Sequence, residues 1–364
     1  MRTMALMALA GMLAACGDGQ AAKAGASGAT ASPGAARPQP PSGQQKFRDW
    51  LAVCDNVGAC HAFGPATDAT GWVRISMEAG PDSAPGVAFG FWPQTDEDIV
   101  DPVTTTVDGA TFDAVISSVD DGPPVAVVAP DRAAALVDAM AQGTAMSVSA
   151  GGQTVSISLT GAAAALLWID ERQGRLNTTT ALMRKGLRPA SAVPAAPARP
   201  RIDAAPAVSQ TGYGDQEGQT LPAGLERLPA VIQCRDDTAF NPDLQKVISS
   251  ARLDADTVLW SVPCGSGAYN SFNAFFTTTP QGTDPRQVAF PRVTGEPDHI
   301  LVNAAYDPTT RVVDAFNKGR GPGDCGLLDS WVWTARGFVL KSSSEMSECW
   351  GVPSDYWPTS WVSQ

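Results

Sequence analysis

Alternating apolar and polar residues predict antiparallel β-structure in the first half of the chain. In GTAMSVSAGGQTVSISLTG, every second residue is apolar on both sides of a glycine pair. The alternation places five apolar side chains on one face of a half-buried hairpin, namely Met146, Val148, Val155, Ile157 and Leu159. A second hairpin is predicted earlier, around the turn sequence DNVG (55–58).

The second half of the chain is more plainly β. The runs DTVLWSVPC, YNSFNAFFTTT and RQVAFPRV each predict a single strand. Two longer runs each predict a pair of strands. HILVNAAYDPTTRVVDAFNKG turns at Asp307-Pro308-Thr309, and DSWVWTARGFVLKSSS turns at Arg336-Gly337. We expect a meander or a small barrel-like sheet.

Two segments carry helix signals. PDRAAALVDAMAQG starts with Pro130 and Asp131 and stops at Gly143, whereas AAAALLWIDERQG stops at Gly174. The predicted fold class is therefore mainly β with a few short helices, as two disulfide-stapled antiparallel β-domains joined by a Pro/Ala-rich linker.

Two stretches rich in Ala, Gly, Pro and Ser divide the chain, and both have little to bury. The first predicts a disordered tether with a root-mean-square reach of roughly 30 Å. The predicted layout is a signal peptide (1–15), a lipidated tether (16–45), an N-terminal β-domain with short helices (46–188), a linker (189–223) and a C-terminal antiparallel β-domain (224–364).

The N-terminus has the three parts of a secretory signal. Arg2 is followed by the apolar run MALMALAGML and by small residues. This run is shorter than the roughly 20 residues of a membrane-spanning helix. Leu13-Ala14-Ala15-Cys16 resembles a bacterial lipobox, which implies that Cys16 is acylated and that acyl chains anchor the protein to a membrane. Because Asp18 does not directly follow Cys16, we favour the outer over the inner membrane of a Gram-negative envelope, with the domains in the periplasm.

The chain has seven cysteines, so at least one lies outside any intrachain disulfide, and Cys16 is that residue. Six paired cysteines in an exported protein allow fifteen connectivities. Proximity in sequence favours three pairs, Cys54–Cys60, Cys234–Cys264 and Cys325–Cys349. A zinc site is the alternative, but the tight paired spacing of zinc ligands is missing. We predict no metal and no cofactor.

Charge disfavours two classes of partner. A chain with a formal net charge of −12 repels nucleic acid and anionic lipid surfaces, so its overall electrostatics offers no phosphate-binding footprint.

Four stretches together resemble the bacterial family called domain of unknown function 1176: FRDWLAVCDNVGACHAFG, LLWIDERQGRLNTTTALMRKG, VPCGSGAYN and YDPTTRVVDAFNKGRGPGDCG. The first part of the chain also resembles the invasion-associated locus B group of secreted β-proteins. The resemblance implies an envelope protein and supplies no catalytic residues.

Signals of catalysis are weak. The chain has two histidines, His61 and His299, and no GxSxG motif that would present a nucleophilic serine to one of them. Ser266 is the conceivable nucleophile. No CxxC pair is present. Acidic pairs such as Glu296 with Asp298, or Asp170 with Glu171, are close in sequence, which does not establish the opposed geometry of a glycosidase. Solvated carboxylates are the simpler interpretation, and we predict no catalytic residue.

Two stretches suggest binding. KGRGPGDCG could form a backbone nest for an anion with Lys318 and Arg320, or it is a loop pinned by Cys325. The tail WGVPSDYWPTSW holds aromatic rings that could stack on sugars or anchor a partner, or that cap the sheet: Trp350, Tyr356, Trp357 and Trp361.

The sequence thus favours a non-enzymatic binding module facing the periplasm, whose partner is an envelope protein or a cell-wall glycan. An acid-dependent hydrolase acting on envelope polysaccharide is the alternative. A cleft converging on two acids, one with a raised pKa, would favour that alternative. A purely structural spacer is the third possibility, and it would have neither cleft nor patch.

Overall fold

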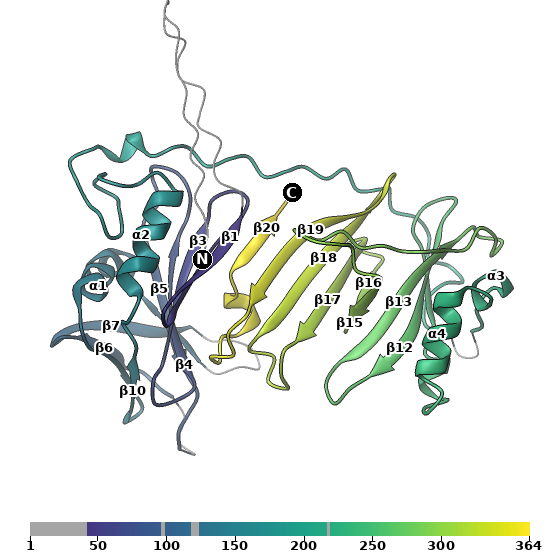
Figure 1. Cartoon of the computed structure of the whole chain (residues 1–364), viewed down its shortest axis with the longest axis horizontal. Coiled ribbons are helices and arrows are strands. Elements are labelled where there is room, and N and C mark those ends of the chain that lie inside the picture. The colour runs from purple at the N-terminus through teal and green to yellow at the C-terminus, as the bar shows by residue number, and fades with distance from the viewer. Residues whose placement is uncertain (1–41, 96–98, 118–123, 217–218) are drawn as a thin grey trace, which may run out of the picture. The chain divides into compact units, whose positions relative to one another are not determined.

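Three antiparallel sheets hold the strands of the described residues, 42–95, 99–117, 124–216 and 219–364 of the computed structural model (Figure 1). The predicted signal peptide (1–15), Cys16 and the predicted tether as far as residue 41 lie outside these residues. The predicted fold class, mainly β with short helices and three disulfides, is confirmed. No helix in the described part of the chain is long and apolar enough to cross a membrane.

The first sheet has ten strands. In spatial order they are β1 (Gly43–Phe47), β2 (Trp50–Cys54), β3 (Cys60–Pro65), β4 (Gly71–Met77), β5 (Gly86–Phe91), β8 (Val125–Val128), β7 (Ala110–Ser117), β6 (Val103–Val107), β9 (Met146–Ala150) and β10 (Gln153–Ile157). The sheet curls, because the end of β10 returns to the end of β3. Ile157 bridges Ala66, and Ser158 donates its N–H to the Pro65 carbonyl. The predicted hairpin at the glycine pair has the expected register, with Val148 opposite Val155 and Met146 opposite Ile157.

Strands β2 and β3 are buried on both faces, which explains their nearly continuous apolar sequences WLAVC and CHAFG. Trp50 and Ala52 belong to the core inside the curled sheet, whereas Leu51 and Val53 belong to a separate cluster on its outer face. Between the two strands Asp55 accepts the N–H groups of Val57 and Ala59, which fixes the DNVG turn.

Helices α1 (Pro130–Gln142) and α2 (Ala162–Arg172) confirm the two predicted helices. α1 buries Ala133, Leu136, Val137 and Met140, the i, i+3, i+4, i+7 spacing of one helix face. Gly161 before α2 has a φ of 108°, and a Cβ there would lie 1.9 Å from the Phe47 carbonyl oxygen, so this position requires glycine.

The second half contains two five-stranded sheets rather than the single sheet that we expected. One comprises β11 (Ser249–Arg252), β12 (Val258–Ser266), β13 (Ser271–Thr278), β14 (Arg286–Gln287) and β15 (Ile300–Val302). The other is a meander of β16 (Ala305–Asp307), β17 (Val312–Lys318), β18 (Gly326–Thr334), β19 (Gly337–Met346) and β20 (Thr359–Val362). The remaining helices are α3 (Ala223–Glu226), α4 (Pro229–Asp237) and the short 3₁₀ turns η1 (Ala190–Ala192), η2 (Leu244–Lys246) and η3 (Ser354–Tyr356).

Both predicted turns of the second half are found, between β16 and β17 and between β18 and β19. Three details differ from the prediction. The segment before the Asp307 turn, predicted as one strand, is divided between β15 of one sheet and β16 of the other. RQVAFPRV forms only the two-residue strand β14, because Phe290 leaves the sheet edge and is fully buried in the core. The aromatic tail, expected to lie beyond the last strand, contains β20, which pairs with β19.

Each of the three disulfides joins a cysteine to the next cysteine along the chain, as predicted from proximity in sequence: Cys54–Cys60, Cys234–Cys264 and Cys325–Cys349.

The end of the chain packs on the outer face of the first sheet. Leu51, Phe63 and Trp72 form one apolar cluster with Val352 and Trp357. At β20, the Asn56 side chain accepts the Val362 N–H at 2.8 Å and donates to the Val362 carbonyl at 3.0 Å. The described residues form one compact unit.

Segment 189–223, predicted as a linker, makes backbone contacts with both later sheets. Ala205 donates its N–H to the Trp333 carbonyl, and Gly214 exchanges hydrogen bonds with Ser250. The predicted domain boundaries themselves stay a prediction.

Candidate functional site

A cleft opens over one face of the β18–β19 pair. Asp329 lies opposite Ser343, and Leu327 lies opposite Glu345, so these four side chains project from the same face. Two residues further along β18, Trp331 is buried in the apolar core with Leu340 of β19. One sheet face is thus apolar at one end and polar at the other, and the polar end forms the floor of the cleft.

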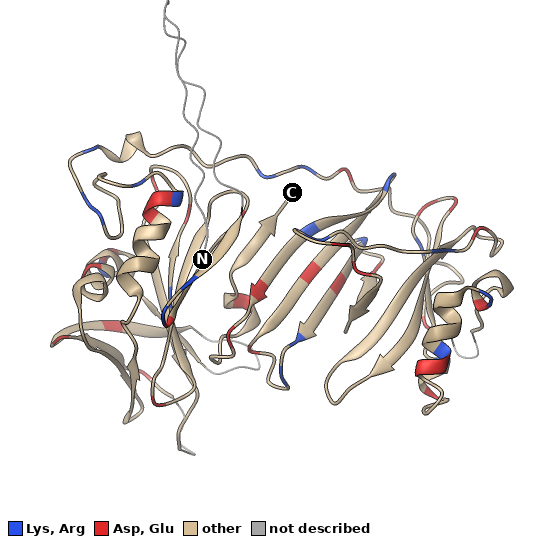
Figure 2. Cartoon of the chain, in the orientation of Figure 1, with Lys and Arg blue, Asp and Glu red and all other residues tan. Residues whose placement is uncertain are grey.

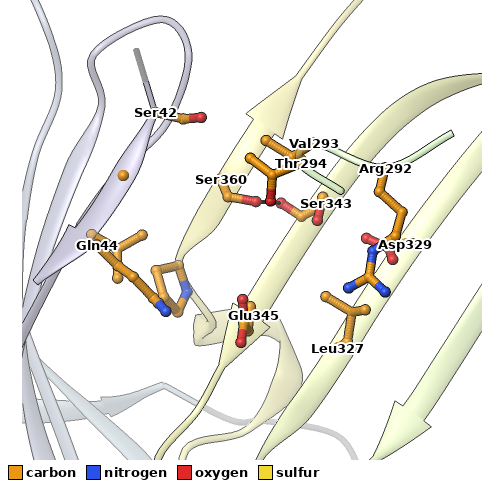
Figure 3. Close-up of a pocket in the computed structure, with 13 residues that line it drawn as sticks. Ser42, Gln44, Arg292, Val293, Thr294, Leu327, Asp329, Ser343, Glu345 and Ser360 are labelled. Atoms are coloured by element: carbon orange, nitrogen blue, oxygen red, sulfur yellow. Dashed lines mark hydrogen bonds between the residues drawn. The ribbon is translucent and has the colours of Figure 1, made fainter. Parts of the chain in front are cut away.

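The walls of the cleft come from distant parts of the sequence. β1 and the residue before it contribute one wall, and the segment 292–294 contributes the other (Figure 3). The cavity has a volume of about 250 Å³. Its lining comprises Ser42, Gly43, Gln44, Val53, Arg292, Val293, Thr294, Leu327, Asp329, Ser343, Glu345, Pro358 and Ser360. A neighbouring cavity of about 120 Å³ shares Arg292, Leu327 and Asp329 and reaches Trp331.

Asp329 is the most unusual group in the cleft. Its side chain is 5% exposed, and its Oδ1 is buried without a hydrogen-bond partner. Burial raises the pKa of Asp329 to about 6. A hydrogen bond from Ser343 and the positive charge of Arg292 lower the pKa and offset part of this effect. The negative charges of Asp298 and Glu345 add to the increase. Near neutral pH this carboxyl therefore exists in both protonation states.

Arg292 balances part of the negative charge. Its Nη1 lies 3.2 Å from Asp298 Oδ1, and Figure 3 shows its side chain next to Asp329. The Glu345 carboxylate, the amide of Gln44 and four hydroxyl groups complete the polar lining, the hydroxyls being those of Ser42, Thr294, Ser343 and Ser360. Such a set of donors and acceptors suits a ligand with many hydroxyl groups. Among the described residues no group of three or more His, Cys, Asp or Glu could hold a metal ion.

The predicted aromatic site does not line this cleft. Trp357 is 4% exposed and donates its indole N–H to the Val352 carbonyl, which fits the alternative in which this ring caps the sheet. Tyr356 packs against Trp72 with 5.6 Å between ring centroids. Trp350 lies under the Lys46 ammonium, and Trp361 is partly buried against the core. The tail is mainly packing because it fills the gap between the first and last sheets.

The glycine-rich loop is held by its own charges. The Arg320 guanidinium contacts both carboxylate oxygens of Asp324 and donates to the Cys349 carbonyl. Although burial opposes ionisation, Arg320 and the Gly351 N–H hold the pKa of Asp324 below its usual value. Lys318 lies over the Phe316 ring at 5.4 Å. Anion binding at this loop stays a prediction, with Arg320 already paired inside the loop.

The other candidates are dispersed. His61 is buried and lies 3.1–3.2 Å from the Arg74 guanidinium, and burial lowers its pKa well below the usual value. His299 contacts the Val288 carbonyl, and Ser266 is an exposed residue at the end of β12. Of the acidic pair on α2, Glu171 is exposed and Asp170 is fully buried.

Asp170 has a structural task. Its carboxylate accepts the N–H groups of Leu182, Met183 and Arg184 at 2.7–3.0 Å. The fully buried Arg175 lies nearby and donates to the Glu78 and Gly80 carbonyls. The motif LLWIDERQGRLNTTTALMRKG thus encodes a braced loop.

Sequence reasoning missed Asp329, Glu345 and Arg292. One signal was available for Asp329, since it shares the parity of Leu327 and Trp331 in GLLDSWVW and is therefore a carboxylate on an apolar strand face. No local signal identifies Arg292 as a cleft residue, because Asp329, which lines the cleft with it, lies far along the chain on β18.

Comparisons with known proteins agree with the resemblance seen in the sequence. The family described as "Protein of unknown function (DUF1176)" matches residues 44–364. The "Uncharacterized protein YpfG" of Escherichia coli (strain K12) is 28% identical over 335 residues, which cover 88% of this chain and 93% of that protein. The crystal structure of invasion associated protein b from Bartonella henselae matches with 19% identity and a TM-score of 0.28, over 36% of this chain and 98% of that one.

Proposed function

Because the chain belongs to the DUF1176 family of proteins of unknown function, we propose its function from its own cleft. The protein is a non-enzymatic module of the bacterial cell envelope that binds a hydroxyl-rich ligand of the cell-wall glycan class. The observation that carries the proposal is Asp329, a buried carboxyl with an unpartnered oxygen in a polar cleft. A hydrogen bond from a ligand hydroxyl to a charged carboxylate contributes about 1.5–3 kcal/mol.

The rest of the cleft supports the same class of ligand. Sugar hydroxyls both donate and accept, and the cleft offers carboxylates, hydroxyls, an amide and a guanidinium within one cavity. The volume of about 250 Å³ suits a small part of a chain rather than a whole polymer.

The proposed location in the cell envelope rests on the N-terminal sequence. We propose that Cys16 is acylated, that the outer membrane holds the anchor, and that the described residues face the periplasm. Three disulfides support export to an oxidising compartment. Metabolic labelling with an alkyne fatty acid tests the anchor, since the label should be lost in Cys16→Ser.

Binding can be measured by titration calorimetry of the full-length protein with soluble oligosaccharides released from bacterial cell wall. We expect Asp329→Asn and Glu345→Gln to weaken binding by tenfold or more, because each removes a charge-assisted hydrogen bond worth about 1.5–3 kcal/mol. Asp314→Asn is a matched control. It removes one carboxylate from the neighbouring strand β17, where Asp314 pairs with Ser330 rather than with a cleft residue.

Absence of binding to the wild-type chain would overturn the proposal. The same conclusion follows if Asp314→Asn weakens binding as much as Asp329→Asn, because the effect would then be general electrostatics and not the cleft.

A specific observation favours a second function, hydrolysis of an envelope polysaccharide. Asp329 has a raised pKa, and Glu345 is its diagonal neighbour across the β18–β19 pair. Diagonal neighbours on one face of a strand pair are about 7–8 Å apart at the backbone. The two carboxyls of inverting glycosidases are about 6.5–9.5 Å apart. Asp329 would protonate the leaving oxygen, and Glu345 would activate a water.

New reducing ends in cell-wall material distinguish the two functions. The binding module predicts none after prolonged incubation. Release of reducing ends by the wild-type protein, lost in Asp329→Asn and retained in Asp314→Asn, would establish the hydrolase instead.

A further inference from the structure

One segment of this acidic protein has the opposite charge. Between Arg172 and Ile202 the chain contains seven Lys and Arg residues and no Asp or Glu, although the whole chain has a net charge of −12. Residues 176–202, here called the basic segment, carry five of these cations, all exposed: Arg184, Lys185, Arg188, Arg199 and Arg201. Figure 2 shows blue patches on the loop after α2 and on the extended segment that follows the loop.

Two of these cations form ion pairs, and Arg188 donates a hydrogen bond to the Leu176 carbonyl at 3.0 Å, which leaves its charge uncompensated. Lys185 forms an ion pair with Asp138, and Arg201 forms one with Asp203 at 3.4 Å. The docking proposed below therefore depends on Arg184, Arg188 and Arg199.

The same loop exposes apolar side chains between its cations. Leu187 is 100% exposed and Met183 is 36% exposed. Leu187 buries no surface in the folded chain and is flanked by the cations Lys185 and Arg188. This combination is typical of a surface that inserts into the interface of a bilayer.

The fold holds this loop rigidly. Asn177 accepts the Arg188 N–H at 3.0 Å and donates its own N–H to the Arg184 carbonyl at 2.9 Å. From below, the buried Asp170 carboxylate accepts three backbone N–H groups, including that of Met183. Leu187 is thus presented by a braced loop, so little conformational entropy is lost when it is bound.

The basic segment also begins near the first described strand. A Cβ at Gly43 would lie 3.3 Å from the Arg172 guanidinium at the end of α2, and the loop follows α2 directly. The predicted tether between Cys16 and β1, with a reach of roughly 30 Å, would therefore start from the same end of the protein as the loop.

We propose that the basic segment docks the protein on an anionic phospholipid bilayer, with Leu187 and Met183 inserted among the head groups and Arg184, Arg188 and Arg199 near lipid phosphates. A bilayer accounts for the exposed leucine and the cations together, whereas an acidic protein would account for the cations alone. The proposal rests on the proposed membrane anchor, since the anchor keeps the loop near the bilayer.

The test uses the full-length chain with Cys16→Ser, which has no acylation site, and with Leu187→Cys carrying an environment-sensitive fluorophore. Vesicles of phosphatidylcholine alone are compared with vesicles that also contain phosphatidylglycerol, both with a nitroxide quencher on the acyl chains. We expect quenching only with phosphatidylglycerol. The triple variant R184Q/R188Q/R199Q should partition roughly a hundredfold more weakly, at about 1 kcal/mol per cation.

Two controls separate docking from general charge. R227Q/K246Q/R286Q removes three exposed cations from the other half of the chain and should leave quenching unchanged. A fluorophore at Phe240→Cys, where the native ring is 71% exposed, should not be quenched. Equal responses at positions 187 and 240, an equal loss in both triple variants, or no quenching on phosphatidylglycerol would overturn the docking. Flotation of the wild-type chain with vesicles tests the anchor separately.

Discussion

Replacing the buried carboxylate of Asp170 by an amide should destabilise the protein much more than the same change at its neighbour Glu171. Asp170 Oδ1 accepts the Leu182 N–H at 2.7 Å, and Oδ2 accepts those of Met183 and Arg184. In Asp170→Asn one of these oxygens becomes an NH₂ group, so at least one backbone N–H faces a donor in the interior.

The magnitude follows from two contributions. An orphaned buried donor costs about 1–3 kcal/mol. The other bonds lose their charge assistance, and hydrogen bonds to charged groups contribute about 1.5–3 kcal/mol against about 1 kcal/mol for neutral ones. The buried Arg175 also loses the electrostatic influence of Asp170, which raises the Arg175 pKa against the larger effect of burial. Since the two contributions overlap, we expect Asp170→Asn to lower the free energy of unfolding by about 3–4 kcal/mol.

Guanidinium denaturation followed by tryptophan fluorescence, with the disulfides intact, measures this difference. Glu171→Gln is the control, since its side chain is exposed and such changes cost under about 0.5 kcal/mol. Trypsin should also cleave after Arg184 and Lys185 sooner in Asp170→Asn, because the loop loses its brace. A loss below about 1 kcal/mol, or equal losses in the two variants, would refute the reasoning.

Three further predictions concern stability. Asp329 has a pKa of about 6 in the folded chain and near 3.9 in the unfolded chain, so the folded chain binds the proton more tightly. The free energy of unfolding should therefore fall by about 2–3 kcal/mol as pH rises from 4 to 7. Asp329→Asn should abolish this loss when unfolding is measured at both pH values. An unchanged pH slope in the variant would contradict the assignment. Removing the Cys325–Cys349 disulfide with a pair of alanines should cost about 3.5 kcal/mol by chain entropy, for residues 24 apart, and a loss under 1 kcal/mol would argue against that account. Trp357→Ala should cost about 3–5 kcal/mol in denaturation and leave glycan binding unchanged, and weaker binding at unchanged stability would restore this residue to the site.

Local patterns were sufficient for the elements that local interactions determine. The hairpin at the glycine pair and helices α1 and α2 follow from period, caps and turn residues, and each has the expected position. The pairing of cysteines by proximity succeeded because each bond joins residues of adjacent elements.

Contacts across long sequence distances were the part that local patterns could not supply. β20 follows from pairing with β19, although Pro358 directly precedes it and no alternation announces it. The cleft needs Gln44, Arg292 and Asp329 at one place, and only the tertiary fold brings them together. Exposure was equally invisible, since nothing in SDYWPTSW distinguishes the buried Trp357 from a ring in solvent.

The packing of the last residues on the first sheet constrains the order in which the protein can mature. Leu51, Phe63 and Trp72 are covered by Val352 and Trp357, and Val362 closes on Asn56. A chain emerging N-terminus first from a ribosome or a translocation channel therefore shows this apolar face to its surroundings until nearly the final residue is released. A chain interrupted before residue 352 would leave this apolar face uncovered, and we expect holding chaperones and quality-control proteases to recognise it.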